Sequence, residues 1–351
     1  MPALPELIRD PIFQLNVLLW LAQPLPSGDA ITPLLHSRGF DVYALALRLS
    51  LPPDLLLVMR NGGFEVQVGV RPDIILAKES SGKFAITECK GSSFGSRSST
   101  AHQAPTLLAL AGPRCHEVLG LQPQAVREST LTYLLPSSQR PAMRATISEL
   151  LAAFRMHGLA VGEALLLGLA IADEALGLEV DDAAAQFFEL PPGTNEFLRL
   201  DPDTDPRPLY FVPFDPDTHQ SEEEKTLGKR ILFERMQSSI IAAVGRAVPP
   251  TVVPFKTSDL LNDATFGMYD LWENRDSAKY MRGLCRWFID SLRKAVHAVE
   301  PEAISYERGE GWKLDLPDRG RHERVLNAML RFSCETMELR QEPEPGLFDD
   351  L

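Results

Sequence analysis

The sequence predicts an α/β domain over residues 1–140 followed by a mainly α-helical domain over residues 141–340. Two observations support this division. Strand-like runs separated by glycine and serine turns concentrate between residues 64 and 135. Longer stretches with apolar residues at helical spacing dominate the rest of the chain. The chain has 351 residues and is 44% apolar, so each part can bury a core of its own.

The first domain is expected to contain a helix, three strands, a second helix and a last strand. Apolar residues at helical spacing predict a helix over residues 32–49, which Pro52 and Pro53 would end. Turn-forming residues at 61–63 and 80–82 separate the strands. The elements expected after the first helix are strands over residues 64–70, 73–77 and 84–90, a helix over 100–111 and a strand over 130–135.

The second domain is expected to begin after the turn at residues 136–138. Alanine and leucine predict two helices over residues 142–175, broken near Gly158, and the proline-rich segment 191–216 predicts a linker with one short strand at 209–212. Further helices are expected over residues 221–247, 276–299 and 321–339. The acidic, proline-containing tail over residues 341–351 is expected to be disordered.

The net charge of −13 is distributed unevenly. Residues 1–140 carry 12 Lys and Arg against 11 Asp and Glu, whereas residues 141–351 carry 23 against 37. A nearly neutral first domain can bind phosphate through a few well-placed cations. The acidic second domain is not expected to lie along DNA by itself.

Membrane insertion and disulfide bonding are not expected. The longest apolar run, residues 164–172, is too short to span a bilayer. The four cysteines lie far apart and form no CxxC pair, which argues against a zinc site or a disulfide framework. Free thiols in a reducing cytoplasm are the simplest interpretation.

The residues with the clearest chemical potential lie between residues 71 and 95. A hairpin centred near Ser81 would place Asp73 opposite Glu88 or Cys89. Because side chains alternate along a strand, Glu88 and Lys90 would share one face. The hairpin is therefore predicted to bring two carboxylates and one ammonium group together at one end of a sheet.

Two carboxylates this close repel each other unless a cation lies between them. Mg²⁺ or Mn²⁺ suits oxygen ligands, and Mg²⁺ keeps waters that a phosphate can displace. We therefore expect Asp73 and Glu88 to bind the metal, with the backbone carbonyl of Cys89 as a further ligand. Such an ion can polarise a phosphoryl oxygen, and Lys90 would orient the attacking water or offset transition-state charge.

Pro72-Asp73 followed by Glu88-x-Lys90 resembles the motif of the PD-(D/E)xK nuclease superfamily. The resemblance implies a restriction-endonuclease-like αβββαβ core with a mixed sheet and the motif on its second and third strands. It implies that Asp73 and Glu88 bind the metal and that Lys90 assists the nucleophile. Many members carry a Gln on the following helix, and Gln103 occupies that position here.

The resemblance covers residues 32–135 only. One branch of the family has a Tyr four residues after the Gln, where this chain has Leu107. Many members also use a Glu on the first helix, for which Asp41 and Glu6 are the nearest acids.

The activity implied is metal-dependent hydrolysis of phosphodiester bonds, with DNA preferred to RNA, in a bacterial restriction or phage-defence system. A protein partner would bind the acidic helical domain or the tail. The alternatives are a catalytically inactive nuclease-fold scaffold or binding subunit, and a helical interaction protein with an accidental motif. In the last case Glu88 and Lys90 form an ordinary surface ion pair.

Other polar clusters have weaker implications. Ser92, Ser93 and Arg97 could cradle a phosphate that His102 approaches, or could belong to a simple polar loop. Two further clusters could contact nucleic acid, although the sequence favours a solvated surface near compensating acids for both. They consist of Arg282, Arg286 and Arg293, and of Arg319, Arg321, His322 and Arg324.

Overall fold

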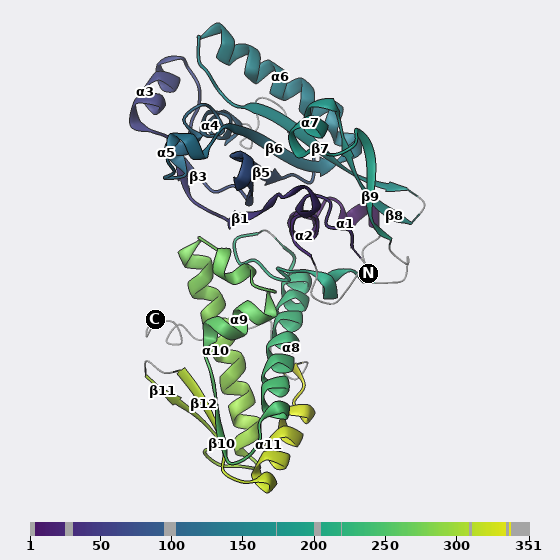
Figure 1. The fold of residues 1–351 in the computed structure, drawn as a ribbon, viewed down its shortest axis with the longest axis vertical. Coiled ribbons are helices and arrows are strands. Elements are labelled where there is room, and N and C mark those ends of the chain that lie inside the picture. Colours follow the sequence, from purple (N-terminus) through teal and green to yellow (C-terminus); the bar gives the residue numbers. More distant parts are fainter. Residues whose placement is uncertain are drawn as a thin grey trace. The chain divides into compact units, whose positions relative to one another are not determined.

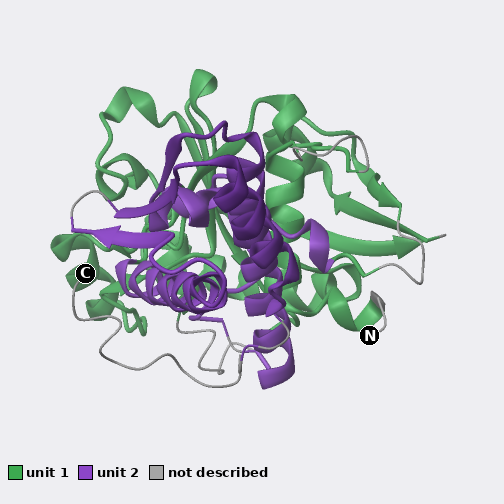
Figure 2. Cartoon of the chain, turned by 90° about the horizontal axis from the view of Figure 1, so that it is seen from below, with its two compact units in different colours: residues 1–206, 271–274 green, residues 207–270, 275–351 purple. Residues whose placement is uncertain are grey.

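A computed structural model describes residues 4–24, 31–94, 103–172, 174–199, 205–218, 220–308, 311–334 and 337. The chain divides into two compact units (Figures 1 and 2). Unit 1 comprises residues 1–206 and 271–274, and unit 2 comprises residues 207–270 and 275–351. No helix within the described ranges has the length and apolar character needed to cross a membrane. The tail at 341–351 lies outside the described residues.

A seven-stranded mixed sheet forms the centre of unit 1. Strands β5, β6 and β7 are parallel, and every other neighbouring pair is antiparallel. In spatial order the strands are β1 (Asp41–Leu45), β4 (Ile74–Lys78), β5 (Lys83–Cys89), β6 (Glu128–Pro136), β7 (Glu163–Ala172), β8 (Ala175–Val180) and β9 (Gly193–Arg199).

Helices and a small second sheet surround these strands. The helices of unit 1 are α1 (Leu4–Leu7), α2 (Pro11–Ala22), α3 (Pro53–Asn61), α4 (Gln103–Leu110), α5 (Cys115–Val118), α6 (Arg140–Met156) and α7 (Asp182–Phe188). Helix α2 contacts β1 and β5, α4 contacts β6, and α6 and α7 contact β7. The short strands β2 (Leu49–Ser50) and β3 (Gly69–Val70) pair with each other.

The expected first helix over residues 32–49 is wrong. Residues 36–38 form one 3₁₀ turn, and residues 41–45 form β1, along which Val42 and Ala44 are buried. The helix that precedes the strands is α2, which Asp10 caps. Every residue from Ile12 to Ala22 is buried, so α2 lacks the polar face by which a surface helix is recognised.

The other expectations for the first 140 residues have mixed outcomes. The strands expected at 73–77, 84–90 and 130–135 are confirmed as β4, β5 and β6. The strand expected at 64–70 is reduced to β3. The helix expected at 100–111 is present as α4, while residues 95–102 lie outside the described part of the chain.

The expected domain boundary near residue 140 is wrong, because the sheet continues through β7, β8 and β9. Of the two helices expected at 142–175, only α6 exists, and the second is strand β7. Its apolar run has no helical or strand alternation because Leu165 to Leu169 lie in the interior of the sheet and are buried. The short strand expected at 209–212 is wrong, because residues 207–209 form a 3₁₀ turn and residues 210–212 form neither helix nor strand.

In its described residues, unit 2 combines four α-helices with a three-stranded antiparallel sheet of order β10-β12-β11. Its elements are α8 (Glu222–Arg246), β10 (Thr251–Phe255), α9 (Thr257–Ala264), α10 (Arg275–His297), β11 (Ile304–Glu307), β12 (Gly311–Leu316) and α11 (Arg319–Arg331). The helices expected at 221–247 and 276–299 are confirmed, and the one expected at 321–339 ends at Arg331. The mainly helical expectation omitted the sheet.

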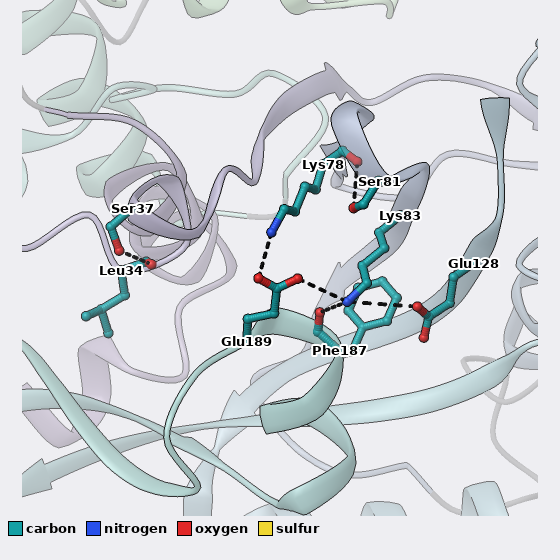
Figure 3. A network of polar contacts seen from close by, with 8 residues as sticks. All are labelled: Leu34, Ser37, Lys78, Ser81, Lys83, Glu128, Phe187 and Glu189. Carbon is teal, nitrogen blue, oxygen red and sulfur yellow. Dashed lines mark hydrogen bonds and ion pairs between the residues drawn. The ribbon is translucent and has the colours of Figure 1, made fainter.

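A polar network holds the turn of the β4–β5 hairpin against the end of α7 (Figure 3). Glu189 accepts hydrogen bonds from Lys78 at 2.6 Å and Lys83 at 3.3 Å. The Lys83 ammonium also donates to the Phe187 carbonyl at 3.0 Å and lies 3.9 Å from Glu128. These contacts fix one end of the hairpin, and the expected functional residues lie at its other end.

Candidate functional site

The hairpin register places Asp73 and Glu88 together. Ile74 pairs with Thr87 in the antiparallel β4–β5 ladder, so the next residues along each strand, Asp73 and Glu88, face each other at its end. The Asp73 carboxylate accepts a 2.6 Å hydrogen bond from the backbone N–H of Cys89. Asp73 is thus fixed to the strand that carries the other two motif residues.

Lys90 shares the side of Glu88, as the alternation of side chains predicts. Its Nζ donates to Oε1 of Glu88 at 2.8 Å. The Glu88 side chain is 7% exposed and that of Lys90 is 19% exposed. The second carboxylate oxygen, Oε2, is buried and has no hydrogen-bond partner among the residues that the structure describes. A buried carboxylate is therefore only half satisfied, which is costly unless another positive group approaches it.

The pKa shifts of Glu88 and Lys90 also indicate that the buried carboxylate favours nearby positive charge. Burial raises the pKa of Glu88 despite the opposing effect of Lys90. Burial by itself would lower the pKa of Lys90, but the charges of Glu88 and Asp73 outweigh it and raise that pKa. The neighbouring Tyr133 of β6 has a pKa raised well above its usual value by burial and by Glu88. The site thus keeps Lys90 cationic and favours additional positive charge near Glu88.

Gln103 begins α4 close to this pair. Its side chain lowers the pKa of Glu88, although it forms no hydrogen bond of standard length to Oε2. The structure therefore places the Gln103 side chain near Glu88. The segment that precedes Gln103, with Arg97 and His102, lies outside the described residues. Ser93 donates to Oε1 of Gln139 through its backbone N–H at 3.3 Å and its hydroxyl at 3.0 Å.

Helix α2 contributes a residue that the sequence reasoning missed. The buried Gln14 donates from Nε2 to the carbonyl of Lys90 at 3.0 Å and to that of Ile8 at 2.7 Å. A Cβ added to Gly91 would lie 2.3 Å from the Arg9 carbonyl oxygen, so the chain passes very close at this point. The only signal in the sequence was a glutamine within an apolar helix.

The two acids considered for the first helix occupy other positions. Asp41 lies at the start of β1 opposite Ala77, whereas the pairing that ends beside Asp73 is that of Leu45 with Ile74. Asp41 pairs with His36 at 2.6 Å. Glu6 lies on α1 and is exposed. The structure therefore gives no reason to place either acid in the site.

The hairpin end offers carboxylate oxygens and, among the described residues, no cluster of zinc-type ligands. Within the described ranges, no group of three or more His, Cys, Asp or Glu side chains could hold a metal. Burial raises the pKa of the Cys89 thiol well above its usual value, which leaves the backbone carbonyl as its available donor. Mg²⁺ is commonly bound by one or two carboxylates together with waters and substrate phosphates. Asp73 and the unsatisfied Oε2 of Glu88 match that pattern.

Comparisons with known proteins add no assignment. No family model matches the chain, and neither the curated proteins nor the solved structures contain a match. The function therefore has to be inferred from the geometry of the site.

Proposed function

We propose that unit 1 is a metal-dependent nuclease that hydrolyses phosphodiester bonds, with DNA preferred to RNA as the substrate. The observation that carries this proposal is the buried, unpartnered Oε2 of Glu88 at a position shared with Asp73 and Lys90. The succession of α2, β1, β4, β5, α4 and β6 supports a PD-(D/E)xK core, with β2, α3 and β3 inserted between its first two strands.

Each residue has a distinct role in this proposal. Asp73 and Glu88 would hold Mg²⁺ or Mn²⁺, and the Cys89 carbonyl could add a ligand. When bound, such an ion polarises a phosphoryl oxygen and lowers the pKa of a water. Lys90 orients the nucleophilic water and offsets the charge that develops on the phosphate. Gln103 positions Glu88.

The backbone of Lys90 is held from a separate element. Gln14 binds the Lys90 carbonyl, and the close passage of Gly91 past Arg9 leaves the strand end little freedom to shift. A catalytic ammonium needs such support, because small misplacements of a charged group reduce its effect on the transition state.

Cleavage of supercoiled plasmid in Mg²⁺, Mn²⁺ or EDTA tests the proposal. We expect nicking or linearisation with either metal and none with EDTA. Asp73→Ala should abolish cleavage, whereas Asp41→Ala, which removes an exposed carboxylate from the same sheet, should cleave like the parent. A parent that leaves DNA and RNA intact in both metals, or an Asp73→Ala variant with full activity, would contradict it.

A catalytically inactive scaffold is the second candidate, and one observation favours it. Lys90 already neutralises Glu88 at 2.8 Å without a metal. In that case the parent would bind no divalent ion even with DNA present. In either case we propose a restriction or phage-defence system as the context, with a protein partner bound to the acidic second part of the chain.

A further inference from the structure

A stripe of basic residues runs along one face of α10. It consists of Arg275, Lys279, Arg282, Arg286 and Arg293, which we call the α10 basic stripe. Their spacings of four, three, four and seven residues place them on one side of a helix. The opposite side carries buried residues such as Met281, Leu284, Phe288 and Leu292. At a rise of 1.5 Å per residue, the stripe is about 27 Å long.

Most of this charge has no ion-pair partner among the residues that the structure describes. In the described part of the chain, Arg275, Lys279 and Arg286 have no acidic side chain within ion-pairing distance, and Arg275 and Lys279 are exposed. Arg282 donates to the Tyr269 hydroxyl at 3.0 Å. Among the described residues, Arg293 is the one member of the stripe that forms an ion pair, with Asp290 at 3.2 Å.

The second basic cluster, on α11, is different. Arg319 pairs with Glu323 at 3.0 Å, and both Arg321 and Arg324 pair with Glu300. The sequence favours, for both clusters, a solvated surface on which nearby acids compensate the basic charge, and the α11 cluster has such acids. The α10 basic stripe lacks them among the described residues, so its charge is available for an external anion.

A hollow continues the stripe at the C-terminal end of α10. It has a volume of about 760 Å³, and Arg293, Lys294, His297 and Tyr306 are among its lining residues. Tyr306 is 51% exposed, and its ring centroid lies 5.1 Å from that of Trp312. Two acids, Glu300 and Glu302, also line the hollow, so the basic character is strongest along α10 itself.

We propose that the α10 basic stripe binds the phosphate backbone of double-stranded DNA. The choice of DNA rests on the proposed function of unit 1, for which unit 2 would recruit the substrate. The net charge of −13 opposes general attraction to polyanions, so affinity has to come from local contacts such as these. The major groove is about 12 Å wide and admits an α-helix, whose basic face can then reach the flanking phosphates.

Helix α10 packs against α9, and the hairpin of β11 and β12 follows it. Residues 265–274 separate the two helices, which is longer than the 3–4-residue turn of a helix-turn-helix motif. The proposal therefore rests on the charge and spacing of the stripe. The proposal changes the interpretation of the acidic second part of the chain, which the sequence did not predict to lie along DNA by itself.

Binding is measured on the full chain in EDTA, so that hydrolysis is absent. Fluorescence anisotropy with a labelled 30-base-pair duplex compares the parent with Arg275→Ala/Lys279→Ala/Arg286→Ala. The matched control, Lys225→Ala/Arg319→Ala/Arg324→Ala, removes the same charge from residues that are ion-paired. We expect at least a tenfold weaker Kd for the stripe variant and a change of less than about threefold for the control.

Salt dependence gives a second readout. Each lost phosphate contact should reduce the slope of log K against log salt by about 0.9, so the stripe variant should lose between about two and three units. Arg275→Lys/Arg286→Lys should retain parental binding, because lysine also contacts phosphate. Equal losses in the stripe and control variants, or parental binding by the stripe variant, would overturn the proposal.

Competition separates duplex DNA from other polyanions. Equal competition by polyglutamate, single-stranded DNA or duplex RNA at matched charge concentration would refute the commitment to duplex DNA. The Asp73→Ala variant distinguishes the two proposals. If it binds the duplex like the parent while the parent cleaves nothing, the nuclease proposal fails and the DNA-binding surface remains.

Discussion

Replacing Lys90 with Ala should destabilise unit 1 in the absence of metal. The change removes the hydrogen-bond partner of Oε1 in a carboxylate whose Oε2 already lacks one, and the Glu88 side chain is only 7% exposed. Breaking a buried ion pair by removing one partner typically costs about 3 to 5 kcal/mol. For a unit of this size, that corresponds to a fall in melting temperature of roughly 10 °C.

Lys78→Ala provides a matched control. Lys78 is 18% exposed and bonds a carboxylate at 2.6 Å, so its own burial and geometry resemble those of Lys90. Its partner Glu189 is 42% exposed, however, and a pair of that kind is worth no more than about 1 kcal/mol. The difference between the stability losses of the two variants therefore measures the effect of burying Glu88.

The assay is thermal melting in EDTA, repeated with Mn²⁺ and at several pH values. Mn²⁺ should restore more stability to Lys90→Ala than it adds to the parent, because the ion replaces the missing positive charge. Burial raises the folded-state pKa of Glu88 above its ordinary value of 4.5, and losing Lys90 should raise it further. A carboxyl of this kind loses stability as pH rises through its folded-state pKa, so the deficit should shrink toward pH 5. A Lys90→Ala variant that melts with the parent in EDTA at pH 8 would refute this reasoning.

Three further predictions test the supports of the site and of unit 2. Gly91→Ala should lower the free energy of unfolding, measured in urea, by about 1 to 3 kcal/mol, because the new Cβ would lie 2.3 Å from the Arg9 carbonyl oxygen. Gly245→Ala is the control and should not destabilise the protein, because the space around its Cβ is open. Ser221→Ala removes the capping box of α8 and should cost about 1 kcal/mol of unfolding free energy, and an equal loss in Ser238→Ala would show that capping is not the cause. Lys78 and Lys83 lower the pKa of Glu189, so its stabilising effect should exist above about pH 4.5 and disappear as pH falls through the lowered pKa. A stability difference between parent and Glu189→Gln that persists in acid or in 1 M salt would contradict that account.

Local signals made the β4–β5 hairpin and its charged end predictable. The turn near Ser81 and the alternation along each strand determine that Asp73, Glu88 and Lys90 converge. Helix α2 was missed and strand β7 was misassigned as a helix for a shared reason. Residues 12–22 of α2 and residues 165–169 of β7 are all buried, so neither segment shows the polar face by which hydrophobic periodicity distinguishes helix from strand.

Long-range contacts could not be predicted from one sequence. Gln14 and Lys90 are 76 residues apart, and nothing in the local pattern of either indicates that they meet. The spacing of the basic residues on α10 was visible in the sequence. Whether those residues have acidic partners depends on where Glu300 and Glu323 lie in the fold. Glu300 neutralises Arg321 and Arg324 on α11 instead.

Titration calorimetry with Mn²⁺ on the parent, Asp73→Ala and Lys90→Ala tests the central claim most directly. We propose that a divalent ion binds between Asp73 and Glu88, beside the like charge of Lys90. We therefore predict that the parent binds Mn²⁺, that Asp73→Ala loses binding, and that Lys90→Ala binds at least as tightly as the parent. A parent that binds no Mn²⁺ in the presence of duplex DNA, or an Asp73→Ala variant that binds it unchanged, would contradict the account.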